Sequence, residues 1–114
     1  MYYPACWDQT AKLSNDDRFK GNVTAYSIVV DSSSTWQQIQ SKVPALASAQ
    51  MLFDTQKKAS GLYGVMTLPS SMHPGLYPGH TYVVIDKQGI VRYVYDDPKM
   101  ALNNDLIARE IAKL

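Results

Sequence analysis

The chain has 114 residues, of which 46% are hydrophobic and 18% charged, and its formal net charge is +1. This length and composition predict one folded domain over residues 1–114 rather than a disordered chain. The nearly balanced charge argues against a nucleic-acid partner, which usually shows as a clustered basic excess. No apolar run is long enough for a transmembrane helix, so we expect no membrane span.

The cysteine count and the first residues bear on the cellular compartment. Cys6 is the only cysteine, so the chain holds no internal disulfide. Residues 1–4 have neither the basic start nor the apolar stretch of a secretory signal. Taken by itself, the sequence predicts a soluble, cytoplasmic protein, although a targeting segment upstream would change that expectation.

In the first half of the chain, segments with apolar residues at helical spacing alternate with segments typical of strands. Cys6, Thr10 and Leu13 fit one helical face, and residues 20–22 supply a stop. A run rich in β-branched residues then predicts a buried strand. Ser34 or Thr35 is expected to cap the next helix, which Pro44 limits.

In the second half, three prolines and two glycines over residues 66–79 argue against regular secondary structure there. The tight turn 87–89 between two β-rich runs predicts a hairpin. Asn103 or Asn104 is expected to cap the last helix. In chain order we expect helix 6–19, strand 23–31, helix 35–43, strand 50–53, helix 57–63, strands 81–85 and 90–95, and helix 102–114. This order indicates a layered α/β sheet.

Two motifs lie within this order. Pro4-Ala5-Cys6 opens a helix, and the strand that follows ends in Asp31. The stretch from Phe53-Asp54 through Tyr63-Gly64-Val65 to residues 80–91 (HTYVVIDKQGIV) is similar to the pattern D…YGV…P-T-x-F-x-I-D-x-x-G. Together they resemble the thioredoxin-like superfamily, specifically its redoxin and peroxiredoxin-related (AhpC/TSA-like) family. The resemblance implies a thioredoxin-like layered sheet with helices on both faces.

One departure concerns the start of the chain. In thioredoxin-like folds a central strand leads directly into the cysteine motif, whereas only residues 1–3 precede it here. Three extended residues span only about 10 Å, which is at most a stub of a strand. We therefore expect an N-terminally truncated form of the fold. A truncated product or misplaced start is the first explanation, and a fragment or a homo-oligomer whose sheet another chain completes are the alternatives.

Cys6 is the main candidate for chemistry. A helix N-terminus favours an anion, so the thiol pKa there can fall below the free value of about 8.5 and give a nucleophilic thiolate. The alternative is a buried structural cysteine, because free cysteine is among the most buried residue types. Asp8 and Gln9 are expected to serve the helix N-terminus, and Trp7 and Trp36 to lie partly in the core.

The resemblance assigns further roles. Aligned with the two-cysteine motif, Tyr3 takes the nucleophile position and Cys6 the resolving one. Aligned with peroxiredoxins, Tyr3 takes the place of the Thr or Ser, where its hydroxyl would donate to a peroxide oxygen. His80 falls where the family has its cis-proline or its arginine, over the sulfur, and there an imidazolium would lower the thiol pKa. Pro78 is the alternative carrier of the cis bond.

Three functions follow from these residues. The first is a thiol-dependent redox protein, either a single-cysteine peroxidase or a thiol-disulfide oxidoreductase, with Cys6, His80 and Tyr3 catalytic. It would act on a peroxide or disulfide substrate, use an external thiol reductant, and need no cofactor or metal. The second is a catalytically lapsed thioredoxin-like binding module. The third is a copper-binding relative with Cys6, His73 and His80 as candidate ligands.

Overall fold

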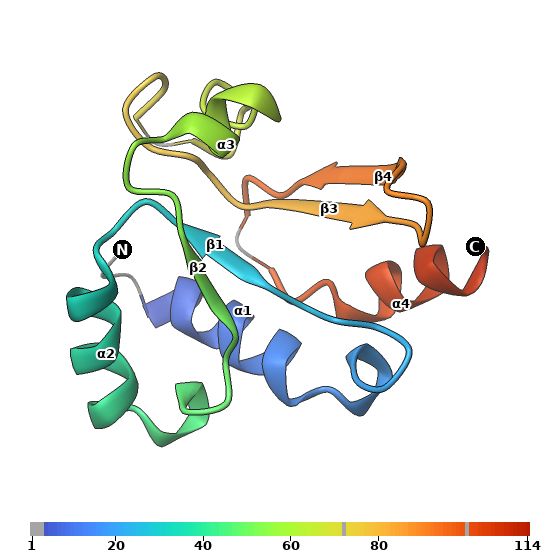
Figure 1. Cartoon of the computed structure of the whole chain (residues 1–114), viewed down its shortest axis with the longest axis horizontal. Helices are drawn as coiled ribbons and strands as arrows, with labels where there is room; N and C mark the ends of the chain where they lie inside the picture. The colour runs from blue at the N-terminus through green and yellow to red at the C-terminus, as the bar shows by residue number, and fades with distance from the viewer. Residues whose placement is uncertain (1–3, 72, 100) are drawn as a thin grey trace.

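The computed structural model describes residues 4–71, 73–99 and 101–114 (Figure 1). Within these residues, helices alternate with short strands in the order that the sequence predicts. The elements are α1 (Pro4–Asn15), β1 (Ser27–Val29), α2 (Ser33–Lys42), β2 (Met51–Phe53), α3 (Lys58–Leu62), β3 (Thr81–Ile85), β4 (Val91–Asp96) and α4 (Asn104–Ala112), with 3-10 turns at Asp17–Phe19 and Pro44–Leu46. No helix in the described ranges is long and apolar enough to cross a membrane.

Several element boundaries differ from the predicted ones. The first helix ends at Asn15 because Asp16 starts a separate 3-10 turn, in which its carboxylate accepts the Arg18 N–H at 3.0 Å. The cap of α2 is Ser32, whose Oγ accepts the Thr35 N–H at 3.3 Å, so the prediction of Ser34 or Thr35 was wrong. The strand expected over residues 23–31 is regular only at Ser27–Val29.

The strands form two separate two-stranded sheets instead of the single layered sheet that we expected. β1 and β2 pair in parallel, with Ile28 opposite Leu52, whereas β3 and β4 form the predicted antiparallel hairpin, with Val84 opposite Tyr93. A cavity of about 640 Å³ lies between β1 and β3. These two strands run in opposite directions, and among the described residues no strand lies between them (Figure 1).

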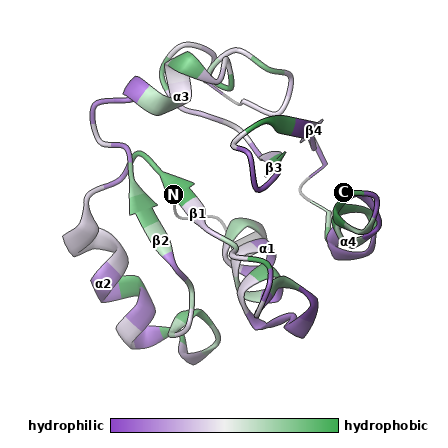
Figure 2. Cartoon of the chain, turned by 45° about the vertical axis from the view of Figure 1, so that its right-hand side comes forward, coloured by the Kyte–Doolittle hydropathy of each residue, from purple (hydrophilic) through white to green (hydrophobic). Residues whose placement is uncertain are grey.

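Two hydrophobic clusters form the core, one on each side of this cavity. The first joins α1, β1 and α2, with Trp36 fully buried at its centre. The second joins the first 3-10 turn, β3 and α4 through Phe19, Val84 and Ile107. Figure 2 shows β1 and β2 as strongly hydrophobic segments, with α1 and α4 on one side of the strands and α3 on the other.

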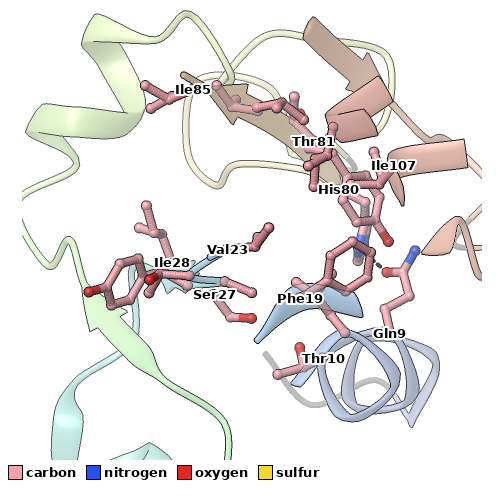
Figure 3. Close-up of a pocket in the computed structure, with 18 of the residues that line it drawn as sticks. Gln9, Thr10, Phe19, Val23, Ser27, Ile28, His80, Thr81, Ile85 and Ile107 are labelled. Atoms are coloured by element: carbon pink, nitrogen blue, oxygen red, sulfur yellow. Dashed lines mark hydrogen bonds between the residues drawn. The ribbon is translucent and has the colours of Figure 1, made fainter. Parts of the chain in front are cut away.

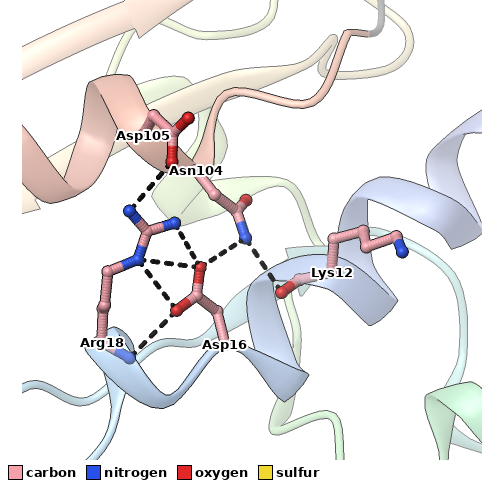
Figure 4. A network of polar contacts seen from close by, with 5 residues as sticks. All are labelled: Lys12, Asp16, Arg18, Asn104 and Asp105. Atoms are coloured by element: carbon pink, nitrogen blue, oxygen red, sulfur yellow. Dashed lines mark hydrogen bonds and ion pairs between the residues drawn. The ribbon is translucent and has the colours of Figure 1, made fainter.

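A polar network on the surface holds α4 against the end of α1 (Figure 4). The Arg18 guanidinium contacts both Asp16 oxygens and donates to Asp105 at 2.9 Å. The Asn104 amide donates to the Lys12 carbonyl and to Asp16, each at 3.0 Å. The hydrogen bonds from Arg18 hold the pKa of Asp16 well below its usual range. This network fixes the C-terminal helix near the start of the chain.

Candidate active site

Cys6 and His80 meet at one end of the cavity, although 74 residues separate them. Cys6 is the third residue of α1, and His80 directly precedes β3. The Cys6 Sγ lies 3.4 Å from His80 Nε2 and 3.7 Å from Nδ1. The Cys6 residue is only 3% exposed, so this contact is largely shielded from bulk water.

The backbone around His80 is held by the loop that comes before it. The His80 N–H donates to Ser70 Oγ at 2.6 Å, and Ser70 Oγ in turn donates to the Asp96 carboxylate. On the β4 side, the Asp97 N–H donates to the His80 carbonyl at 2.8 Å. Gly79 passes so close to Ser70 that an added Cβ would overlap it. A side chain at residue 79 would therefore displace His80.

Gln9 determines which nitrogen of the His80 ring carries the proton. Its Nε2 donates to the Ala101 carbonyl at 2.7 Å, so its Oε1 is the atom that lies 2.9 Å from His80 Nδ1 (Figure 3). An amide oxygen only accepts, so Nδ1 must be the donor in this contact. In the neutral ring Nε2 is then the unprotonated nitrogen, and it is the one closest to the Cys6 sulfur.

Burial shifts the pKa values of both side chains in the direction that favours their neutral forms. It raises the pKa of the Cys6 thiol, and it lowers the pKa of the His80 imidazole despite the opposing effect of Asp97 and Asp96. The resting pair is therefore a thiol beside a neutral imidazole. We expected the helix N-terminus to lower the pKa of the Cys6 thiol, and an imidazolium at His80 to lower it further. Neither expectation is met, because burial outweighs these effects.

Asp97 organises the segment that orients Gln9. Asp97 is only 2% exposed. Its carboxylate accepts hydrogen bonds from the backbone N–H groups of Lys99 at 2.9 Å and Ala101 at 2.7 Å. It also accepts one from the side-chain amide of Asn103 at 2.7 Å. Burial raises the pKa of Asp97, but these hydrogen bonds outweigh it and leave that pKa below its usual value. The Ala101 carbonyl is thereby held where Gln9 reaches it.

The other candidate residues are placed as follows. Tyr3 lies outside the described residues. The Tyr77–Pro78 bond is trans, since the described part of the chain has no cis peptide, and His80 is the residue that contacts Cys6. His73 is exposed and packs edge-on against Tyr77. The described ranges contain no group of three or more His, Cys, Asp or Glu residues that could hold a metal ion, which leaves the copper interpretation without a ligand set.

The roles of Gln9 and Asp97 were not predicted. We expected Gln9 to serve the helix N-terminus, but its side chain reaches across to His80. Its spacing of three residues from Cys6, which places both on one helical face, is the signal that could have indicated this. For Asp97, the sequence holds no comparable signal.

Taken together, the alternating α/β order and a cysteine at the start of a helix beside a histidine define a thiol-containing α/β domain. The model of the AhpC/TSA family matches residues 2–94, which is most of the chain. The chain therefore belongs to the AhpC/TSA family, and the resemblance noted from the sequence is confirmed. Membership implies a thioredoxin-like fold and suggests thiol redox chemistry of the redoxin and peroxiredoxin type. Among curated proteins, no match was found.

Proposed function

We propose that this protein is a thiol peroxidase in which Cys6 is the nucleophile and His80 is the general base. The observation that carries the proposal is the 3.4 Å contact between Cys6 Sγ and the unprotonated His80 Nε2. A base at this distance can accept the thiol proton directly. Membership of the AhpC/TSA family supports the same chemistry.

The reaction proceeds in two stages. The Cys6 proton passes to His80 Nε2, and the thiolate attacks one oxygen of the peroxide. The O–O bond breaks, the sulfur becomes a sulfenic acid, and the leaving oxygen takes the proton from Nε2. An external thiol then attacks the sulfenic sulfur and releases water, and a second thiol resolves the mixed disulfide and restores Cys6.

The burial of the sulfur favours a peroxide over a protein disulfide as the substrate. A disulfide within another protein must bring its sulfur into line with the attacking thiolate, and a residue that is 3% exposed offers little access for this. A small hydroperoxide can reach Cys6 through the cavity, because Cys6 forms part of the cavity wall. The oxidoreductase alternative would require the site to open.

The test is to treat the purified protein with stoichiometric peroxide and trap sulfenic acid for mass spectrometry. We expect one trapped adduct, located on Cys6 and absent in Cys6→Ser. His80→Gln should slow its formation roughly 100-fold, as for the loss of a general base, whereas the exposed His73→Gln should not. The absence of an adduct would refute the peroxidase proposal, and equal rates in the two histidine variants would refute the role of His80.

A catalytically lapsed binding module is the second candidate, and the burial that raises the Cys6 pKa favours it. The rate of Cys6 alkylation by iodoacetamide, compared between the wild type and His80→Gln at one pH, separates the two candidates. A base that accepts the thiol proton should make the wild type react faster than the variant. Equal rates, together with no sulfenic acid, would identify the lapsed module.

A further inference from the structure

The Asp96 carboxylate collects three hydrogen-bond donors from two segments that meet beside the candidate site. From the loop between α3 and β3 it accepts the Ser70 N–H at 2.9 Å and the Ser70 hydroxyl. From the first residue of β3 it accepts the Thr81 hydroxyl at 3.0 Å. Asp96 is the last residue of β4. Its side chain therefore ties the loop to the start of the β3–β4 hairpin.

The direction of these hydrogen bonds makes Ser70 the link between Asp96 and His80. A carboxylate only accepts, so the Ser70 hydroxyl must direct its single proton to Asp96. The lone pairs of the Ser70 oxygen are then left to accept the His80 N–H at 2.6 Å. Ser70 is 5% exposed, so bulk water has little access to replace either partner. Asp96 thereby fixes the orientation in which Ser70 holds His80.

The anchored residue, His80, has to reach two groups at once. Its Nε2 lies 3.4 Å from the Cys6 sulfur, and its Nδ1 lies 2.9 Å from Gln9 Oε1 (Figure 3). Both contacts depend on the position of the His80 backbone, which is held through its carbonyl by the Asp97 N–H and through its N–H by Ser70. A displacement of about 1 Å at a catalytic group can cost roughly 100-fold in rate. Loss of the Ser70 anchor should therefore affect the chemistry at Cys6.

We propose that Asp96 is a positioning residue, which holds the His80 base beside Cys6 through Ser70. Its hydrogen bonds go to Ser70 and Thr81 and not to the reacting groups, so it is not itself a catalytic residue. The kinetic consequence rests on the proposed function, in which His80 accepts the Cys6 proton. The placement of the His80 ring does not rest on it, and a separate readout measures that placement.

Two variants test the link, and a neighbouring serine provides the control. Ser70→Ala removes the acceptor of the His80 N–H. Asp96→Asn keeps the shape of the side chain, but one of its two oxygens becomes an amide that only donates, so it cannot accept from all three donors. Ser71→Ala is the matched control, because Ser71 is 7% exposed and its hydroxyl donates at 2.6 Å to the Tyr77 carbonyl in the same loop.

The first readout is the nitrogen NMR signals of the His80 ring at about pH 8, where a ring of lowered pKa is neutral. These signals distinguish the two tautomers. We expect the proton on Nδ1 in the wild type and in Ser71→Ala, because Gln9 accepts it there. In Ser70→Ala and Asp96→Asn, we expect the Nε2–H tautomer to appear as the ring leaves Gln9. A loss of stability that does not displace His80 would leave the tautomer unchanged.

The second readout is the rate at which stoichiometric peroxide converts Cys6 to sulfenic acid. Ser70→Ala and Asp96→Asn should both be slower than Ser71→Ala, roughly tenfold to 100-fold. The double variant of His80→Gln and Ser70→Ala should be no slower than His80→Gln alone, since Ser70 acts through the imidazole. A structural effect independent of the His80 ring would instead slow both backgrounds equally.

Two results would overturn the proposal. One is an unchanged tautomer in both Ser70→Ala and Asp96→Asn, and the other is equal slowing by Ser70→Ala with and without the His80 ring. If these variants fail to fold, amide hydrogen exchange in the wild type decides the question. The His80 amide should then exchange slower than in an unfolded chain, on the order of tenfold or more, and an unprotected amide would refute the anchor. If no protein forms sulfenic acid, the proposed function fails, whereas the tautomer still decides whether Asp96 positions His80.

Discussion

Replacing Asp97 by alanine should destabilise the protein and loosen the active site at the same time. The Asp97 carboxylate accepts two backbone N–H groups and the Asn103 amide. Alanine would leave all three donors without their partner. It would also free the Ala101 carbonyl, which orients Gln9 toward His80.

The size of the effect follows from these donors. A buried donor left unsatisfied costs about 1–3 kcal/mol. Lys99 and Ala101 are exposed residues, so water can replace part of the lost interaction, and the lower end of that range applies. Three donors at about 1 kcal/mol each predict a loss of about 3 kcal/mol in the free energy of unfolding.

Urea denaturation followed by tryptophan fluorescence, to which Trp7 and the buried Trp36 both contribute, measures this loss. The exposed Asp8→Ala is the matched control and should stay within about 0.5 kcal/mol of the wild type. Because the pKa of folded Asp97 is lowered, its contribution is complete above pH 4 or so and is lost as the pH falls through the folded pKa. If Asp97→Ala unfolds at the same urea concentration as Asp8→Ala, the reasoning is refuted.

Three further predictions concern the histidine, its glycine neighbour and the core. Because burial lowers the pKa of His80, its stabilising effect is complete above about pH 6.5 and is lost as the pH falls through the folded pKa. The urea midpoint should therefore fall less between pH 7 and pH 5 in His80→Gln than in the wild type. Equal falls in the two proteins would contradict this. Gly79→Ala should shift the NMR signals of His80, because the added Cβ would overlap Ser70. The control Gly61→Ala should not, because a Cβ there meets open space. Unchanged signals in both variants would show that the close approach to Ser70 is unimportant. Leu46→Ala should lower the free energy of unfolding, measured by urea denaturation, by about 2–5 kcal/mol. Leu62 is 80% exposed, so Leu62→Ala should leave the free energy of unfolding almost unchanged. Similar losses in the two variants would be inconsistent with the packing described.

Patterns local in sequence were sufficient for part of the fold. The hairpin was predictable because β-branched runs flank a turn whose Gly89 has a φ of 81°, a conformation that glycine adopts readily. The cap of α2 was not predictable, because Ser32 is the first of three consecutive serines with equivalent side chains. The short extent of β1 was not predictable either, since a strand continues only where a neighbour accepts its hydrogen bonds, and residues 23–26 line the cavity instead.

The candidate active site was also predictable only in part. Cys6 could be proposed from its place at the start of a helix, and His80 from the position that it takes in the family resemblance. The effect of burial on their pKa values could not, because it arises from packing between distant segments. Asp97 accepts donors from a loop that follows it, and no spacing rule distinguishes such an aspartate from an exposed one.

The sequence separations within the site have a consequence for protein synthesis. Gln9 lies 92 residues before its partner Ala101, and Cys6 lies 74 residues before His80. The ribosome therefore releases the cysteine long before either partner exists. Contacts this distant form only after the chain has closed a large loop. During that interval the thiol lacks both its burial and its base, so it reacts as an ordinary exposed thiol, and the reaction assisted by His80 begins only after folding.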